Sequence, residues 1–512
     1  MDSYTKLRNL LGEVFDLAAT DALLDWDQQT MMPPGGAEGR ARARALINRT
    51  AHDRFVSAEM EDLLEAARKE VAGRDPDSDE ARIVRRVSID FEKERRVPSE
   101  WVAHFFYAAT LSQQAWEEAK PGSDFDKFKP HLEKMVGLRR EYADFFAPYD
   151  HVYDPLVDDF EPGMKTRQIS ELFAQLRQRQ VRLVRSILER GKAVNAAPLH
   201  RSYPVRKQEA FSLEVARALG YDLRCGRIDV AAHPFTNGLN PGDVRITTRY
   251  DPRYIGSALF STIHESGHAM YDQGVPASIA NIPTRLGQSL SPSFVSSMGV
   301  HESQSRLWEN FVGRGRPFWV HYYPTLKKLF PSPLEGVGLE TFYRAINKVK
   351  PSLIRTESDE ATYNLHVMLR FDLETSLMTR SLEVSDLPEA WNAKMQEYLG
   401  LTPPDHAQGV LQDIHWSIGY IGYFPSYTLG NVMAGQLWER ITEDVPDLSH
   451  QIERGEFGSL LSWLRDFSPR NDLSKTKGNA SGAMPRPLSA TLSRVAPSRT
   501  SADSPILPPS WV

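Results

Sequence analysis

Apolar residues spaced three or four positions apart run through most of this chain, and this pattern limits what it can fold into. Near the start the spacing joins Leu7, Leu10, Leu11, Val14 and Phe15. Such spacing places the side chains on one face of an amphipathic helix. With 41% hydrophobic residues over 512 positions, these faces supply enough apolar material for a large core. The pattern therefore predicts a mostly helical globular protein.

Seven further segments with the same spacing are predicted to be helices, over residues 37–52, 58–69, 81–97, 101–120, 125–146, 166–191 and 207–219. Alternation with a period of two, which is typical of β-strands, is rare. The clearest case is Asp243–Tyr250, which is rich in β-branched residues and has a proline near each end. We expect it to be a strand that pairs with residues 223–231 as a hairpin or a short sheet.

The composition of the chain changes at Pro469. Residues 469–512 contain seven prolines and eight serines and show no periodic apolar face. Segments of this kind cannot bury enough apolar surface to fold. We therefore expect a single large helical domain over residues 1–468, followed by a disordered Ser/Pro-rich tail over residues 469–512.

Charge and cysteine content exclude several classes of function. The 61 lysines and arginines nearly balance the 67 acidic residues, and the net charge of −6 argues against a nucleic-acid partner. No apolar run is long enough to span a membrane, and the N-terminal residues lack the pattern of a signal peptide. The single cysteine, Cys225, favours a reducing compartment and excludes a zinc site built from thiolates. We expect a cytoplasmic protein.

Residues 264–268 read His-Glu-Ser-Gly-His, the H-E-x-x-H pattern, in a segment with helical spacing that ends at Gly274. Residues four apart lie on one face of a helix, so His264 and His268 can bind one Zn²⁺ while Glu265 faces its open side. Two hydrogen-bonded core histidines are the alternative interpretation. A catalytic zinc also needs a third protein ligand. The pattern in which that ligand is a third histidine is excluded, because position 274 is glycine.

A glutamate on a following helix is another common third ligand. Glu302 lies at the start of a segment with helical spacing that begins at His301. Taken alone it is weak evidence, because acidic residues are ordinary in the first turn of a helix.

Five motifs in this order resemble those of the carboxypeptidase Taq family of bacterial metallocarboxypeptidases: DVRIT (243–247), HESGH (264–268), HESQS (301–305), IRTESD (354–359) and GVLQDIHW (409–416). The similarity covers residues 1–465. It implies an almost wholly α-helical fold with a deep groove, similar to that of neurolysin. It also implies a homodimer, one divalent metal per chain, either Zn²⁺ or Co²⁺, and peptide substrates with a free C-terminal carboxylate.

Carried over by position, the resemblance makes His264, His268 and Glu302 the metal ligands and Glu265 the general base. The chemistry of these residues agrees. Two histidines and one glutamate leave a fourth position on zinc for a water molecule, whose pKa falls towards about 7. Glu265 takes the proton of that water and passes it to the leaving amine. The implied reaction is the release of single amino acids from the C-termini of peptides.

A carboxypeptidase also needs a cation that holds the α-carboxylate of its substrate. Arg355 in IRTESD is the expected anchor, because a guanidinium binds a carboxylate through two parallel hydrogen bonds. An ion pair with neighbouring Glu357 or Asp359 is the alternative. Arg245 in DVRIT is a second candidate, although the nearby Asp243 suggests a structural ion pair.

Four more residues have candidate roles. Tyr423 and His415 are placed to donate to the oxyanion or to the substrate carboxylate, although His415 is almost as well explained as a buried histidine beside Trp416. Asp359 is expected to accept a hydrogen bond from a ligand imidazole, with charge on a helix surface as the alternative. His233 in AHPF resembles a position that lines the groove of the family, and a core histidine explains it equally well.

Three features depart from the family. Ser358 replaces the usual alanine of IRTESD, the segment 281–299 is longer than usual, and the Ser/Pro-rich tail stands where a helical segment is expected. An inactive peptide-binding scaffold, or an oligopeptidase on the same fold, is the alternative function. Intact metal ligands and Glu265 favour the enzyme. The side-chain preference, the native metal and the physiological substrates do not follow from the sequence.

Overall fold

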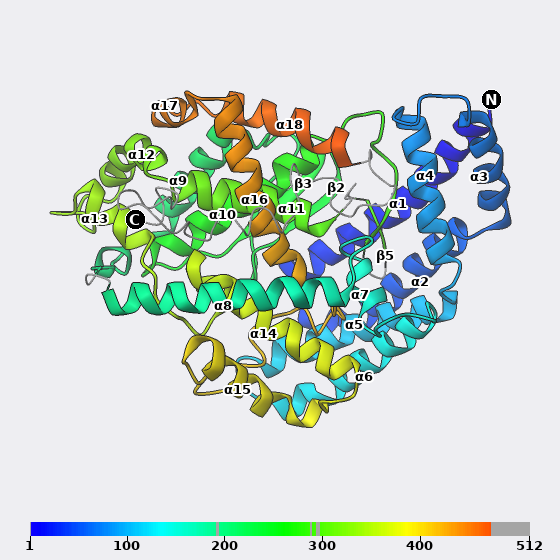
Figure 1. Ribbon diagram of the computed structural model, residues 1–512, viewed down its shortest axis with the longest axis horizontal. Helices are drawn as coiled ribbons and strands as arrows, with labels where there is room; N and C mark the ends of the chain where they lie inside the picture. The colour runs from blue at the N-terminus through cyan, green and yellow to red at the C-terminus, as the bar shows by residue number, and fades with distance from the viewer. Residues whose placement is uncertain (1, 191–193, 287–288, 293–296, 473–512) are drawn as a thin grey trace, which may run out of the picture.

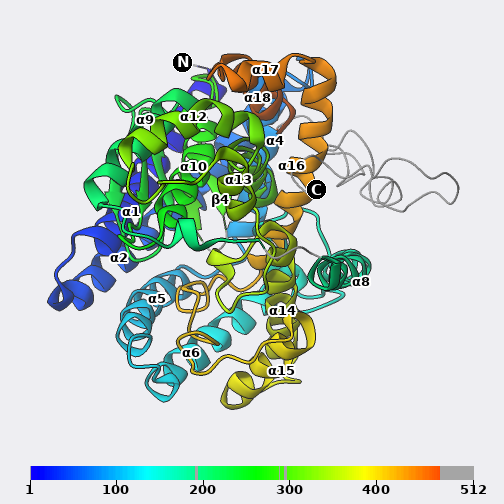
Figure 2. The same cartoon turned by 90° about the vertical axis from the view of Figure 1, so that its left-hand side faces the viewer.

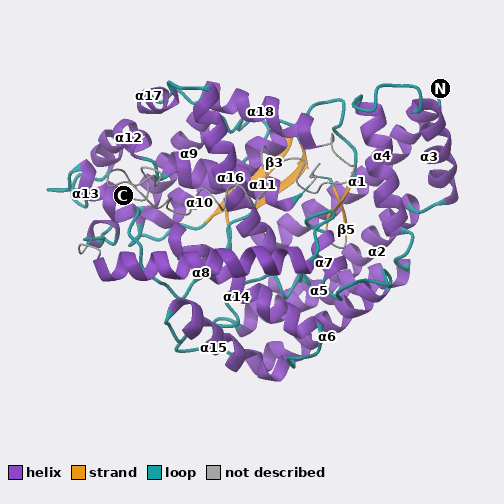
Figure 3. Ribbon diagram, viewed as in Figure 1, coloured by secondary structure: helices purple, strands orange, loops and turns teal. Residues whose placement is uncertain are grey.

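The computed structural model describes residues 2–190, 194–286, 289–292 and 297–472. Helices make up most of these residues, and the strands are short (Figures 1 and 3). In these ranges every helix is too short or too polar to cross a lipid bilayer. The predicted fold class, mostly α-helical with a small sheet, is confirmed.

The described residues up to 219 form nine α-helices: α1 (Ser3–Thr30), α2 (Ala37–Phe55), α3 (Ala58–Val71), α4 (Asp79–Glu94), α5 (Ser99–Ala119), α6 (Phe125–Asp144), α7 (Asp154–Asp158), α8 (Thr166–Arg190) and α9 (Val205–Leu219). The seven segments predicted after the first helix are all found, with ends within three residues of those expected. Side-chain caps fix several starts. Asp2 accepts a hydrogen bond from the backbone N–H of Thr5 at the start of α1, and Ser57 caps α3 in the same way.

The remaining helices are α10 (Ile255–Gln273), α11 (Met298–Arg306), α12 (Arg316–Leu329), α13 (Leu339–Ile346), α14 (Glu360–Met378), α15 (Leu387–Leu399), α16 (Phe424–Asp444), α17 (Leu448–Glu453) and α18 (Gly458–Asp472). A π-helical segment, Leu307–Gly313, directly continues α11. The last turn of α18 includes the first residues of the predicted tail. Residues 473–512 of that tail lie outside the described part of the chain.

A three-stranded sheet packs beside α10. Its strands are β1 (Ile228–Val230), β2 (Thr236–Asn240) and β3 (Asp243–Thr248), in the order β1-β3-β2. The predicted strand over 243–250 is β3, and β1 pairs with it in parallel. β2, which the sequence did not reveal, pairs with β3 in the antiparallel direction. A separate ribbon, β4 (Thr284–Leu286) and β5 (Ser289–Ser291), lies in the segment 281–299.

Two of the buried apolar clusters lie on either side of the region that carries the HESGH and HESQS motifs. One is formed by α5, α6, α8, α14, α15 and the loop before α16, here called the α14 half. The other is formed by α9, α10, α12, α13 and the π-helical segment, and together with α11, which packs on α10, it is here called the α10 half. They occupy the lower and upper parts of the molecule in Figures 1 and 2. α16 joins them, because Phe424 and Leu429 pack in the first cluster while Leu437 and Ile441 pack in the second.

Candidate active site

Three helices approach one another closely where the HESGH and HESQS motifs meet. At Gly267 of α10, a Cβ atom would lie 2.7 Å from the Cα atom of Ser305 on α11. At Gly430 of α16, a Cβ atom would lie 2.6 Å from the Cβ atom of Glu302 on α11. Glycine is therefore needed at both positions, because a side chain would force the helices apart.

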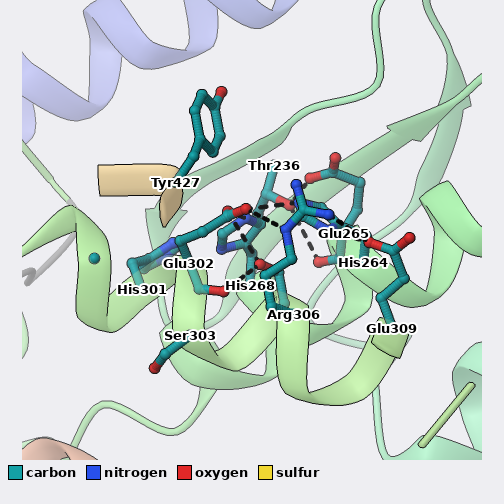
Figure 4. A network of polar contacts seen from close by, with 12 residues as sticks. Thr236, His264, Glu265, His268, His301, Glu302, Ser303, Arg306, Glu309 and Tyr427 are labelled. Atoms are coloured by element: carbon teal, nitrogen blue, oxygen red, sulfur yellow. Dashed lines mark hydrogen bonds and ion pairs between the residues drawn. The ribbon is translucent and has the colours of Figure 1, made fainter. Parts of the chain in front are cut away.

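The side chains of His264, His268 and Glu302 converge on one space (Figure 4). Oε2 of Glu302 lies 3.2 Å from Nε2 of His268 and 3.6 Å from Nε2 of His264. Two ligands bound about 2.1 Å from a tetrahedral zinc ion lie roughly 3.4 Å apart, so both distances from Glu302 have the spacing of metal ligands. Within the described ranges, this is the one group of His, Cys, Asp or Glu side chains arranged to hold a metal ion.

The protonation states of His268 and Glu302 suit a metal, while, despite burial, the carboxylates of Glu302 and Glu309 raise the pKa of His264. Burial and the neighbouring His301 lower the pKa of His268 to about 3, so its ring is neutral, as a metal ligand must be. Burial would raise the pKa of Glu302, but Arg306 and His264 lower it below its ordinary value. Nε of Arg306 donates to Oε1 of Glu302 at 2.6 Å, and Oε2 is the oxygen that faces the histidines.

Carboxylate side chains contact two of the histidine rings in this region and orient them. Glu309, in the π-helical segment, is hydrogen-bonded to Nδ1 of His264 at 2.9 Å. Most metal-bound histidines have such a partner. The ring of His301 stacks on that of His268 with 4.4 Å between centroids, and its Nε2 atom lies 3.1 Å from Oδ1 of Asp272.

Asp359 has a different place from the one expected. Its carboxylate caps α14 and accepts hydrogen bonds from the backbone N–H groups of Ala361, Thr362 and Lys350. Asp359 was expected beside a ligand imidazole, and it is Glu309 that lies beside one, that of His264. The sequence did not single out Glu309, because a π-helical turn shifts side chains out of the ordinary helical spacing.

Glu265 lies on the same turn of α10 and is held by β2. Oγ1 of Thr236 donates to its Oε2 atom at 2.6 Å (Figure 4). Burial raises the pKa of Glu265, and the opposing effects of His264 and Thr236 do not cancel this rise. A carboxyl group with a raised pKa beside a metal site is suited to act as a general base. The sequence did not single out Thr236, because it did not reveal the strand β2 that carries it.

Arg355 lies in a short 3₁₀ turn before α14, and its side chain is 2% exposed. Nε and Nη2 both donate to Oδ1 of Asp413, at 3.0 and 2.8 Å, and Nη1 donates to the hydroxyl of Tyr363 at 2.7 Å. The ion pair is thus with Asp413 of GVLQDIHW, and not with Glu357 or Asp359. Among the described residues these bonds use three of the five guanidinium N–H groups, which leaves two for a ligand.

Tyr363 connects Arg355 to the metal-ligand group. The guanidinium of Arg306 lies 3.9 Å from the centre of the Tyr363 ring, while the Tyr363 hydroxyl accepts from Arg355. Arg306 in turn binds Glu302. The tertiary structure therefore brings the metal-ligand group of the α10 half close to the expected anchor of the α14 half.

Arg245 has the structural role that its neighbours suggested. Nε and Nη2 donate to the two carboxylate oxygens of Asp243, at 2.9 and 2.8 Å. The guanidinium also packs over the Trp26 ring of α1, 4.7 Å from its centre. These contacts tie the sheet to the N-terminal helices.

Aromatic and histidine side chains surround Arg355. Nε2 of His415 lies 2.8 Å from the hydroxyl of Tyr427, whose ring centre is 4.7 Å from the Arg355 guanidinium, and the Tyr423 ring lies 5.4 Å from that of His415. Figure 4 shows Tyr427 on the same side of the helices as the metal-ligand group, with its hydroxyl pointing away from Glu302. The sequence did not single out Tyr427.

His233 lies 6.5 Å from His415, measured between ring centroids. Its Nδ1 atom is hydrogen-bonded to the carbonyl oxygen of Pro234 at 2.8 Å. Burial and Arg355 lower the pKa of His233 to about 4, so the ring is neutral at pH 7. Its Nε2 atom is then an acceptor, which suits a substrate N–H group and not a carboxylate.

A mostly helical chain in which two histidines and a glutamate converge beside a second glutamate has the features of a metal-dependent peptidase. Comparison with known proteins gives the family. The sequence pattern of the carboxypeptidase Taq (M32) metallopeptidase family matches residues 6–469, and the chain belongs to this family. It is therefore a metal-dependent carboxypeptidase, as its motifs predicted.

Relatives align with the chain over nearly its whole length. Thermostable carboxypeptidase 1 of Thermus thermophilus is 41% identical over 500 residues, which cover 94% of this chain and 96% of the relative. Carboxypeptidase 1 of Bacillus subtilis is 37% identical over 458 residues, or 90% and 89%. The solved structure of an M32 carboxypeptidase from Deinococcus radiodurans superimposes with a TM-score of 0.85 at 39% identity and covers 96% of this chain and 97% of that one.

Proposed function

We propose that this carboxypeptidase holds one divalent metal, Zn²⁺ or Co²⁺, between His264, His268 and Glu302. The observation that carries the proposal is the convergence of their three donor atoms beside Glu265. A divalent metal bound there lowers the pKa of a water molecule and polarises the scissile carbonyl group. Nitrogen and carboxylate donors in this number suit zinc and its close neighbours among the transition metals.

Glu265 acts as the general base in this proposal. Its carboxylate accepts the proton that the attacking water loses and gives it to the amide nitrogen that leaves. The hydrogen bond from Thr236 holds Oε2 and fixes the orientation of the carboxyl group. Tyr423, Tyr427 and His415 supply candidate donors for the oxyanion.

Arg355 holds the terminal carboxylate of the substrate through its two remaining N–H groups. Asp413 and Tyr363 already fix the guanidinium, so binding orders few additional bonds. Because Tyr363 also contacts Arg306, the anchor lies at a fixed separation from the metal ligands. An anchor connected in this way to the metal ligands favours reaction at the last peptide bond and thus the release of single residues.

The proposal also includes the oligomeric state and the cellular location of the protein. The resemblance to the family supports a homodimer. The single cysteine, Cys225, supports a reducing, cytoplasmic location.

The test compares an N-blocked dipeptide that has a free carboxylate with the same dipeptide amidated at its C-terminus. We expect the free peptide to lose its last residue at least about 30-fold faster. Chelators should abolish this activity, and Zn²⁺ or Co²⁺ should restore it. Equal cleavage of both peptides would overturn the anchor and favour an oligopeptidase. Binding without cleavage would favour a scaffold.

A further inference from the structure

A second buried arginine lies behind Arg355. Arg370 of α14 is fully buried, and its Nε atom donates to Oδ2 of Asp413 at 2.6 Å. Nη1 donates to the carbonyl oxygen of His366, also at 2.6 Å, and the guanidinium packs 4.5 Å from the centre of the Trp391 ring. Asp413 therefore binds one arginine with each of its two carboxylate oxygens.

This cluster of Arg355, Arg370 and Asp413 carries one unbalanced positive charge. In the described part of the chain, Asp413 is the one carboxylate that forms an ion pair with either arginine. Burial and the nearby arginines lower the pKa of His366 and of His415 well below the ordinary value, so both rings are neutral. An unbalanced charge among side chains that are at most 9% exposed is costly unless an anion completes the cluster.

We propose that Arg370 is a positioning residue that makes the substrate anchor a net cation. This inference rests on the proposed role of Arg355 as the anchor. If Asp413 faced Arg355 alone, the pair would be neutral and would attract a carboxylate only weakly. Because Arg370 balances Asp413 from the other side, Arg355 keeps an unbalanced charge for the substrate. The terminal carboxylate then completes a cluster of two cations and two anions.

The same arrangement selects against substrates without a free C-terminus. An amidated peptide brings no negative charge, so the buried positive charge stays unbalanced when that peptide binds. Selectivity for carboxylates thus depends on the charge of the whole cluster, and not only on the hydrogen bonds that Arg355 makes.

Arg370→Met tests the proposal, because it removes the charge and keeps the length of the side chain. We expect the preference for the free over the amidated dipeptide to fall about 10- to 30-fold, mainly through a higher KM for the free peptide. Calorimetry with N-acetylalanine and its amide should show the same loss of selectivity without turnover. Arg177→Met is the matched control, because Arg177 pairs with Asp372 on the outer side of α14.

The double variant Arg370→Met/Asp413→Asn separates charge from structure, because it returns the cluster to one net positive charge. We expect it to recover part of the selectivity lost in the single variant. Unchanged selectivity in Arg370→Met, or a double variant no better than the single one, would overturn the proposal. Arg370→Gln serves in the same comparison if Arg370→Met does not fold, as judged by thermal unfolding.

The outcome for Arg355→Ala distinguishes the two possible failures. If that variant loses selectivity while Arg370→Met keeps it, the anchor stands and the role of Arg370 is wrong. If Arg355→Ala also keeps the selectivity, the anchor itself is wrong.

Discussion

The two halves of the active site carry opposite charge. Around the ligand histidines lie the carboxylates of Glu265, Glu302 and Glu309, with Asp272 behind His301, and two arginines, Arg306 and Arg314, bind Glu302 and Glu309. Carboxylates outnumber arginines there, which suits a divalent cation. In the α14 half, two arginines share one aspartate, and one positive charge is left over. The site is thus prepared for a metal at one end and for a carboxylate at the other.

The two halves also differ in how they are built. The metal-ligand group lies on α10 and α11, which glycines allow to pack in close contact. The anchor comes from a 3₁₀ turn and from the loop that carries Asp413. Glu374 of α14 holds that loop, since it accepts hydrogen bonds from Nε1 of Trp416 at 2.7 Å and from the backbone N–H of Gly422 at 3.1 Å. Changes in the α10 half should therefore affect chemistry, and changes in the α14 half should affect selectivity and stability.

Glu265→Gln should have the largest effect and acts on the α10 half. The amide can still accept the hydrogen bond from Thr236 but cannot take a proton. We expect kcat to fall by about 10²- to 10⁴-fold while elemental analysis still finds one metal ion per chain. His264→Ala, by contrast, should lose tightly bound metal. Near-normal kcat in Glu265→Gln would mean that another group is the base.

Arg355→Ala should have the next largest effect and acts on the α14 half. Losing one partner of a buried charge pair costs about 2 to 5 kcal/mol, so kcat/KM for free peptides should fall on the order of 30- to 5,000-fold. The amidated peptide should be hardly affected. Steady-state kinetics on both peptides measure the difference. Equal losses would make Arg355 structural and would leave Tyr423 as the better candidate for the carboxylate site.

Glu374→Gln tests whether a buried carboxyl group makes the α14 half sensitive to pH. Burial raises the pKa of Glu374 to about 7, because the hydrogen bonds that it accepts offset desolvation only in part. The folded state thus binds the proton more tightly than the unfolded state. The contribution of Glu374 to the free energy of unfolding is complete below pH 4.5. It is lost as the pH rises towards 7, which lowers the free energy of unfolding by roughly 3 kcal/mol.

The variant lacks this titration, so its free energy of unfolding should change less over the same pH range. Urea denaturation of both proteins at several pH values between 4.5 and 7.5 measures the two slopes. Parallel slopes would show that Glu374 does not titrate in this range.

Glu309→Gln should have the smallest effect, and Asp359→Asn is its matched control. Removing the charge behind His264 should weaken metal binding about 10- to 100-fold. Asp359→Asn weakens the cap of α14, at a cost of up to about 1 kcal/mol, and should leave metal affinity unchanged. Competition with a chelating dye and thermal unfolding separate the two effects. The reverse result would return Asp359 to the role that the sequence suggested.

The sequence by itself determined the helical fold and the core of the catalytic pattern. Helices follow from local spacing, so the seven segments predicted between residues 37 and 219 are all found, with ends within three residues of those expected. His264, Glu265 and His268 lie within one turn of one helix, and a helical period alone brings them together. Glu302 and Arg355 needed more than spacing, because single charged residues near a helix start are ordinary, and the family motifs supplied the missing context.

Only the tertiary structure decided which side chains surround these residues. Asp413 lies 58 positions from Arg355, and Thr236 lies 29 positions from Glu265, on a strand too short to show a clear pattern. Glu309, and not Asp359, lies beside a ligand histidine, because Asp359 caps α14 while Glu309 extends from the π-helical segment. Such contacts depend on which loops and helices pack together, and a local sequence pattern carries no information about partners so far along the chain.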